Sequence, residues 1–416
     1  MTKVVIVLGR GTEGCGVTQC AIQMQKVTGA TILSANDKKW GRSKGLDIIQ
    51  TEMSLGKRCQ EMIDIVNSYD LCVVYSIPSK SHPQDCQDNF LTFLDGIKIR
   101  KAFINVDHKA ASIARNANLK EVCEKFDVIM THSLQNDFAK FMNKNKIMTP
   151  ITKMSLGFDY DGHRERFWLP IQEQQNNMVR WIGRTAMWKG PNLMIDFHQD
   201  ELMDNGFITV LEGLEASIQY PLVLYRDNAA VSPVDRRKVM NYFRQEKQYD
   251  SHLTKFTSDL YSKEVEGVGA YLYPQYINSD AMERMARSAF GSDLYYLKAA
   301  AYGNNIENCH AEIIASGSVP LFHKHFCDNV IHKVQGKPIS QCQNSGTLGL
   351  DYTNFAECRE TMIRLKNDPS MRDDWREMAF EFWKQHSNGV DVVDEIIQLA
   401  IETKQNQPRG LEEYFQ

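Results

Sequence analysis

The stretch RWIGRTAMWKGP, residues Arg180–Pro191, decides how the second half of the chain is interpreted. An apolar run ends in Gly183 and Arg184, and Lys189 with Gly190 follows five residues later, where we expect a helix to begin. Two cations beside a helix N-terminus form a clamp for a diphosphate, because arginine can bind bidentately and lysine acts as a point charge. The alternative is a pair of cations on the protein surface.

The second motif is a glycine-rich turn, GRGTEGCGVT (Gly9–Thr18), which follows the first apolar run of the chain. Its glycines, among them Gly14 and Gly16, let backbone N–H groups approach an anion at a helix N-terminus. The G-x-G-x-x-G spacing also occurs in NAD-binding proteins, but alone it is a weak signal. A tight turn without a ligand is the other interpretation.

Short apolar runs bounded by turn residues recur along the chain, with stretches long enough for helices between them. In the first part they are Val4–Leu8, Ala30–Ser34, Leu71–Ser76, Ala102–Asn105 and Val128–Thr131. In the second part they are Val179–Ile182, Phe207–Leu211, Ala270–Tyr273 and Val319–Phe322. This alternation predicts an α/β fold with parallel sheets covered on both faces.

The segment Asp159–Asn177 interrupts this rhythm with Asp-Gly, a proline and a Gln/Asn cluster, and predicts a linker. We therefore expect two Rossmann-like doubly wound domains that face a central cleft, over residues 1–165 and 178–370. Residues 371–416 should form helices that pack across both domains.

Composition excludes several classes of protein. The chain has 416 residues, 43% of them hydrophobic and 24% charged, which excludes a disordered chain and fits two domains. Lys and Arg number 48 and Asp and Glu 52, so the net charge of −4 argues against a protein that coats nucleic acid. The ten cysteines form no C-x2-C pair, which indicates reduced thiols and no metal site. No apolar run approaches the roughly 18 residues of a spanning helix, so we expect an intracellular protein that does not enter a membrane.

A third motif is HAEIIASGSVPLF (His310–Phe322), in which Glu312 precedes a glycine turn and a strand. The motif is similar to the ribose-binding glutamate region of retaining two-domain glycosyltransferases. The order of the three motifs, a glycine-rich turn, Gly-Arg…Lys-Gly and then Glu312, matches that of a GT-B glycosyltransferase.

Four stretches together resemble the DNA α-glucosyltransferase family of T-even bacteriophages. They are GRGTEGCGVT, RWIGRTAMWKG, YINSDAMERMARSAFG (Tyr276–Gly291) and the His310–Phe322 run. The resemblance extends through most of the chain, including Lys101–Asn116, and is weakest around Ser217–Glu266. It implies sugar transfer from a UDP-sugar, with retention, to the hydroxymethyl oxygen of 5-hydroxymethylcytosine in double-stranded DNA. Because no metal-binding constellation stands out in the sequence, we expect no obligate metal.

The resemblance also assigns roles on the donor side. Arg184 and Lys189 would neutralise the leaving diphosphate, and Glu312 would hold the ribose. Ser288, Phe290 and Gly291 would line the sugar site, with Ala289 where the wider pattern has glycine.

Asp107 is the residue we expect near the reacting centre, followed by His108. Asp107 comes just after an apolar strand, at the carboxyl edge that faces the cleft, where a carboxylate could accept the hydroxymethyl proton or stabilise an oxocarbenium-like transition state. A helix cap with a structural histidine is the alternative.

The family has His-Asp-His at residues 106–108, whereas this chain has Val106 in place of the first histidine. Valine cannot contact the hydroxyl on the sixth carbon of glucose, so we hypothesise UDP-arabinose as the donor rather than UDP-glucose, with neutral drift at Val106 as the competing explanation.

The acceptor side depends on one basic, aromatic loop, KKWGRSK. We expect it to contact DNA phosphates and to offer a ring for stacking, through Lys38, Lys39, Trp40, Arg42 and Lys44. Because the target group is inaccessible inside a duplex, base flipping is expected.

The resemblance places a monomeric enzyme in the cytoplasm of an infected bacterium. A GT-B transferase with a non-DNA acceptor and a catalytically silent relative that binds DNA or a nucleotide sugar stay open; an NAD dehydrogenase fits least.

Overall fold

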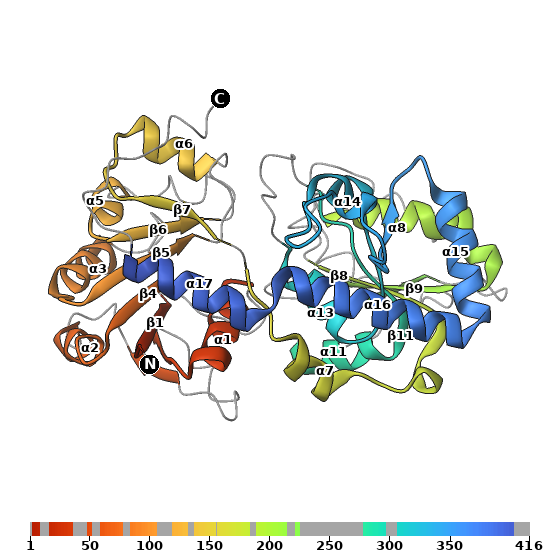
Figure 1. Cartoon of the computed structure of the whole chain (residues 1–416), viewed down its shortest axis with the longest axis horizontal. Helices are drawn as coiled ribbons and strands as arrows, with labels where there is room; N and C mark the ends of the chain where they lie inside the picture. Colours follow the sequence, from red (N-terminus) through yellow and green to blue (C-terminus); the bar gives the residue numbers. More distant parts are fainter. Residues whose placement is uncertain are drawn as a thin grey trace, which may run out of the picture. The chain divides into compact units, whose positions relative to one another are not determined.

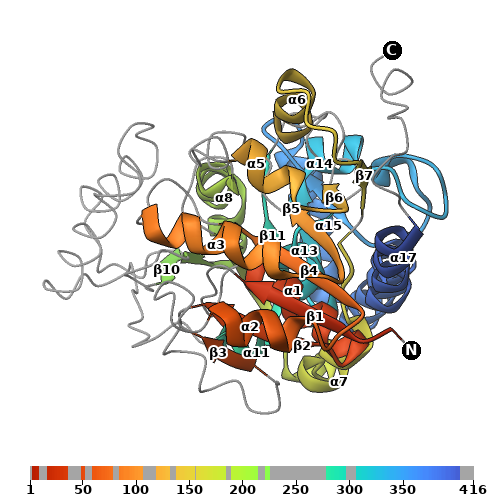
Figure 2. The same ribbon diagram turned by 90° about the vertical axis from the view of Figure 1, so that its left-hand side faces the viewer.

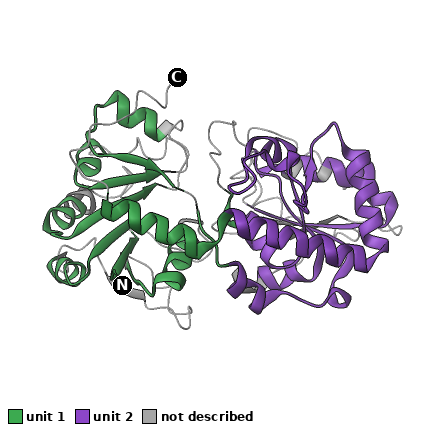
Figure 3. Ribbon diagram, in the orientation of Figure 1, with its two compact units in different colours: residues 1–159, 300–308, 387–416 green, residues 160–299, 309–386 purple. Residues whose placement is uncertain are grey.

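The computed structural model describes residues 2–8, 16–35, 48–51, 59–77, 84–105, 119–131, 137–154, 156–183, 189–213, 221–224, 278–296 and 306–402. The chain divides into two compact units (Figure 3). Unit 1 comprises residues 1–159, 300–308 and 387–416, and unit 2 comprises residues 160–299 and 309–386.

Unit 1 is built on a parallel sheet with the strand order β3-β2-β1-β4-β5-β6-β7 (Figure 1). The strands are β1 (Val4–Leu8), β2 (Thr31–Ala35), β3 (Ile48–Thr51), β4 (Leu71–Ser76), β5 (Arg100–Asn105), β6 (Val128–Thr131) and β7 (Ile151–Lys153). The helices are α1 (Gly16–Thr28), α2 (Cys59–Val66), α3 (Gln84–Gly96), α5 (Leu119–Glu124), α6 (Asp137–Lys144) and α17 (Gly389–Glu402).

Alternation along the strands separates the core of unit 1 into two clusters. Val5 and Val7 of β1 pack with residues of α2, α3, α5 and α6, whereas Val4, Ile6 and Leu8 pack with α1 and α17. Successive side chains of a strand point to opposite faces, so a continuous apolar run is the pattern of a sheet that is covered on both sides. Figure 2 shows α3 and α17 on opposite sides of this sheet.

Unit 2 is built on a second sheet with the order β10-β9-β8-β11-β12-β13, parallel except for the antiparallel pair β9 and β10. Its strands are β8 (Gln175–Gly183), β9 (Ile208–Gly213), β10 (Pro221–Leu224), β11 (Ser288–Asp293), β12 (Val319–His323) and β13 (Leu348–Leu350). Its α-helices are α7 (Tyr160–Phe167), α8 (Pro191–Phe197), α11 (Asn278–Ala286), α13 (Asn308–Ala315, whose first residue clusters with unit 1), α14 (Lys324–Asn329), α15 (Phe355–Asn367) and α16 (Pro369–Ser387).

The sequence predicted most strands of both sheets but missed five. Predicted apolar runs appear as β1, β2, β4, β5, β6, β8, β9 and β12, with differences of at most two residues at their ends, except that β8 begins at Gln175 rather than Val179. The predicted strand Ala270–Tyr273 lies outside the described residues. The missed strands are β3, β7, β10, β11 and β13.

The linker interpretation is wrong at both ends of the segment, because residues Tyr160–Phe167 form helix α7 and strand β8 begins at Gln175. Tyr160, His163 and Phe167 lie on one face of this helix and are buried. Tyr160 meets Phe380 edge to face at 5.8 Å, and Arg164 makes an ion pair with Glu377. Contacts with α16 thus stabilise a helix whose own composition predicts an irregular segment.

The last two described helices belong to different units. Helix α16 is part of unit 2 as far as His386, whereas Val392, Val393, Ile396 and Ala400 of α17 belong to a core cluster of unit 1. At the start of α17 the backbone of Gly389 lies close to that of Phe158, and the Gly389 amide donates to the Phe158 carbonyl at 2.7 Å. A Cβ on Gly389 would lie 2.9 Å from that carbonyl, so only glycine fits.

Among the described helices, none combines the length and the apolar character that crossing a membrane requires.

Candidate functional site

Lys189 lies in the turn between β8 and α8, at the carboxyl edge of the unit 2 sheet. The Trp181 indole N–H, buried in β8, donates to the Lys189 carbonyl at 3.0 Å. The next residue, Gly190, has φ +65°, and a Cβ there would lie 2.6 Å from the Leu294 carbonyl oxygen. The glycine is therefore needed for both the backbone conformation and the close approach of the chain that follows β11.

The ammonium of Lys189 is held by two side chains from the end of β11. Its Nζ lies 3.1 Å from Asp293 Oδ2 and 4.1 Å from the centre of the Tyr295 ring. The Lys189 side chain is 11% exposed and that of Asp293 is fully buried. A desolvated ion pair with a ring beneath the cation holds a charge in one place far better than a surface lysine would.

His310 on α13 fixes the backbone of Asp293. Its Nε2 lies 3.3 Å from the Asp293 carbonyl oxygen, and since that oxygen can only accept, the Nε2 atom must carry the hydrogen. The ring is buried with its centre 4.3 Å from those of Phe322 and Phe326. Aromatic packing thus keeps the imidazole aimed at the end of β11.

Glu312 lies in the second turn of the same helix and is 6% exposed. Its carbonyl accepts a hydrogen bond from Ser316 Oγ at 2.7 Å, and His163 Nε2 lies 3.0 Å from the same hydroxyl. The end of α13 is therefore tied to α7. The predicted contact of Glu312 with a ribose stays a prediction.

The three predicted sugar-site residues of β11 are inside the core of unit 2. Ser288 Oγ donates to the Arg284 carbonyl at 3.0 Å and lies 3.2 Å from Arg180 Nε, while Phe290 packs edge-on against Phe207. A Cβ on Gly291 would lie 2.5 Å from the side chain of Ile313, so this glycine lets α13 lie close to the sheet. These packing roles are what the structure records; a contact with the sugar stays a prediction.

Several predicted site residues lie outside the described part of the chain. They are Gly14, Lys38, Lys39, Trp40, Arg42, Lys44, Val106, Asp107, His108 and Arg184. Gly16 is the first residue of α1. Of the predicted diphosphate clamp, the structure therefore places Lys189 alone.

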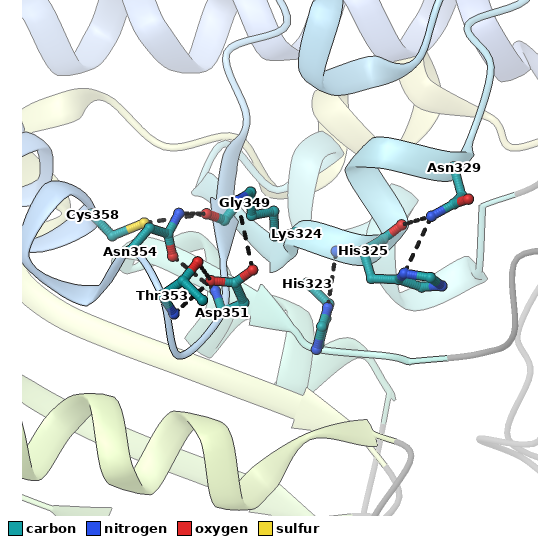
Figure 4. A network of polar contacts seen from close by, with 9 residues as sticks. All are labelled: His323, Lys324, His325, Asn329, Gly349, Asp351, Thr353, Asn354 and Cys358. Atoms are coloured by element: carbon teal, nitrogen blue, oxygen red, sulfur yellow. Dashed lines mark hydrogen bonds and ion pairs between the residues drawn. The ribbon is translucent and has the colours of Figure 1, made fainter.

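His323 and His325, which flank Lys324, belong to a polar network at the end of β12 (Figure 4). The His325 amide donates to His323 Nδ1 at 3.1 Å, so the His323 side chain caps α14. Burial, and then the neighbouring His325, lower the pKa of His323 from 6.5 to about 4, which keeps the capping ring neutral at pH 7. In the described ranges, no three His, Cys, Asp or Glu side chains gather where they could hold a metal ion.

Sequence reasoning missed Asp293 and Tyr295 and gave His310 no role. A strand that reads SAFGSD has only two apolar residues, so neither periodicity nor β-propensity marks its end as a position that faces a site. The one available signal was the His310 motif, which places a histidine two residues before Glu312.

Comparison with known proteins places this geometry in a family. A model of the family described as "DNA alpha-glucosyltransferase" matches residues 15–226 and 264–372. The DNA alpha-glucosyltransferase of Enterobacteria phage T4 is 28% identical over 407 residues, covering 93% of this chain and 96% of that protein.

Solved structures agree with this match. An alpha-glucosyltransferase in complex with UDP-glucose and DNA containing an abasic site is 27% identical, with a TM-score of 0.77 over 96% of this chain and 99% of that one. The alpha,alpha-trehalose-phosphate synthase (UDP-forming) of Burkholderia vietnamiensis has a TM-score of 0.53 at 11% identity, over 96% of this chain and 100% of that one. The second likeness concerns the fold alone, and the expected GT-B fold class is confirmed.

Proposed function

Because the chain belongs to the DNA alpha-glucosyltransferase family, we propose that it transfers a sugar from a UDP-sugar to the hydroxymethyl oxygen of 5-hydroxymethylcytosine in double-stranded DNA. The observation that carries the donor side is the buried, oriented ammonium of Lys189 at the carboxyl edge of the unit 2 sheet. In open α/β sheets this edge is where ligands bind.

Lys189 would act on the group that leaves. Departure of UDP from the sugar places negative charge on the diphosphate, and a fixed cation stabilises that charge without first having to reorganise. The Lys189 side chain is only 11% exposed, so water screens its charge less than it screens the charge of a surface lysine. Arg184, five residues earlier, would supply the bidentate partner.

The acceptor chemistry belongs to residues of the first domain. Asp107 would accept the hydroxymethyl proton or stabilise the oxocarbenium-like transition state, with His108 beside it, and the basic loop Lys38–Lys44 would contact the DNA backbone. The base would leave the stack to reach them. Retention of anomeric configuration is proposed from the family alone.

The sugar is proposed to be arabinose or glucose. One relative was solved with UDP-glucose, which favours a hexose. Val106 favours a pentose, because an unpaired glucose hydroxyl against an apolar wall would cost roughly 1–3 kcal/mol.

One experiment tests this reaction and its two donors. The protein is incubated with hydroxymethylated duplex DNA and either UDP-glucose or UDP-arabinose, the DNA is digested, and the nucleosides are weighed. A hexose or pentose added to hydroxymethylcytosine is the expected result. UDP release without a modified nucleoside would indicate a different acceptor, and no UDP release would indicate a silent relative.

The role of Lys189 is tested by Lys189→Ala in the same assay. We expect kcat/KM for the UDP-sugar to fall about 100- to 1,000-fold, the range for removing one fixed group that stabilises charge in the transition state. Lys366→Ala, which removes a lysine that bonds the Asn205 carbonyl elsewhere in unit 2, is the control and should leave kcat/KM unchanged. Equal activity of the two variants would remove Lys189 from the proposed mechanism.

A further inference from the structure

We propose that Asp293 is a positioning residue for the transfer reaction: anchored by His310, it holds the Lys189 ammonium where the donor diphosphate binds. This inference rests on the proposed function and adds residues to it. Asp293 would not touch the reacting atoms; it would act through Lys189.

The geometry is a chain of three contacts that ends at the lysine. His310 Nε2 donates to the Asp293 carbonyl at 3.3 Å, and Asp293 Oδ2 accepts from Lys189 Nζ at 3.1 Å. The imidazole lies 4.0 Å from that same carboxylate oxygen. The three side chains come from α13, β11 and the turn after β8, so the contact chain connects elements that are distant in sequence.

The cost of burying these charges argues against a purely structural pair. Taking a carboxylate and an ammonium out of water is expensive, and apolar residues of similar volume often give equal or greater stability at such positions. A buried ion pair is therefore weak evidence for stability, whereas it is well suited to fixing the position of a charge that a ligand will meet.

The second oxygen of the carboxylate supports the same conclusion. Asp293 Oδ1 is buried and has no hydrogen-bond partner within the part of the chain that the structure describes. Unsatisfied buried polar groups in native proteins require an explanation, and a functional role is one such explanation.

Calorimetric titration with UDP tests the proposal on four proteins: wild type, Asp293→Asn, Lys189→Ala and the double variant. Asn keeps the shape of the side chain but lacks the charge that holds the ammonium. We expect Asp293→Asn to weaken UDP binding about 10- to 100-fold, the loss that follows when a group that orients a metal ligand is removed. Because Asp293 acts through Lys189, the double variant should bind UDP as Lys189→Ala does, within about twofold.

Asp373→Asn is the control, because it also removes a carboxylate from an ion pair in unit 2, here a 44% exposed one whose Oδ1 lies 2.6 Å from Arg376 Nε. It should leave UDP binding unchanged. Unchanged or tighter UDP binding by Asp293→Asn would overturn the proposal, since a carboxylate that merely repels the diphosphate predicts tighter binding. A wild-type protein that binds no UDP would instead overturn the proposed function.

A second measurement does not depend on the folding of Asp293→Asn. In ¹⁵N-lysine-labelled wild-type protein, with Lys189→Ala for assignment, the Lys189 ammonium should exchange its protons with water far more slowly than the other lysines before UDP is added. Rapid exchange in the free protein would show that the ammonium is not held and would overturn the proposal.

Discussion

The central strands of the two sheets bury different kinds of side chain. In unit 1, β1 reads VVIVL and all five residues are buried and apolar. In unit 2, β11 reads SAFGSD, and all six residues are buried although three have polar side chains. Two of these polar side chains have partners from other elements: Asp293 pairs with Lys189, and Ser288 donates to the Arg284 carbonyl.

This difference indicates where the candidate functional side chains of each unit lie relative to its strands. Strands such as β1 provide packing only, and the residues we predicted to act in the first domain follow the strands in sequence rather than lie within them. In unit 2 the strand itself carries the carboxylate that holds the lysine. Disturbing the core of unit 2 should therefore weaken UDP binding, whereas disturbing the core of unit 1 should not.

The largest expected effects come from a matched pair of core aromatics, Phe103 in β5 of unit 1 and Phe290 in β11. Each is at most 2% exposed, so Phe103→Ala and Phe290→Ala should each lower the free energy of unfolding by about 3–5 kcal/mol, measured by denaturant titration. Calorimetry on the folded variants should show weaker UDP binding for Phe290→Ala alone, because β11 carries Asp293. Equal losses of UDP affinity in both variants would break the comparison.

A smaller effect should follow from filling the space at Gly291. A Cβ there would lie 2.5 Å from Ile313 Cγ2 and 2.8 Å from Met285 Sδ, so Gly291→Ala should destabilise unit 2 by about 1–3 kcal/mol. Gly349 in β13 is the control, since the nearest atom to its Cβ position is 3.5 Å away. Gly349→Ala should stay within about 0.5 kcal/mol of wild type. If both substitutions are tolerated alike, close packing of α13 on β11 is not required.

The smallest effect is a dependence of stability on pH. The pKa of His323 is about 4 in the folded protein and 6.5 in an unfolded chain, so between these values the unfolded state binds more protons. The free energy of unfolding should therefore fall as the pH drops from about 6.5 toward 4, and the full stability is present above 6.5. We expect a loss of about 1 kcal/mol, since solvent screens a ring that is only partly buried.

Thermal unfolding of wild type and His323→Asn across this pH range checks that expectation. Asparagine can cap α14 through its side-chain oxygen without titrating. The variant should lose less stability than wild type between pH 6.5 and 4, and parallel curves would remove His323 as the cause.

Strands with continuous apolar runs could be predicted from the sequence, whereas the polar strand β11 could not. The continuous apolar runs of β1, β4 and β6 gave their bounds as the structure has them, because burial on both faces leaves a local signal. Strand β11 left none, since its identity depends on parallel pairing with β8 and β12. Lys189 was predicted from its place before a helix, but its partner Asp293 is 104 residues away, and no local pattern connects them.

The contribution of α17 to unit 1 has a consequence for the order of events on the ribosome. Residues 387–402 supply part of the cluster that covers one face of a sheet made from the first 153 residues. Domains generally fold as they emerge, amino-terminal first. Here that face stays partly uncovered while more than two hundred further residues are synthesised, so the unit made first is completed last. Until α17 arrives, Ala102 and Ile104 of β5 lack part of their apolar cover.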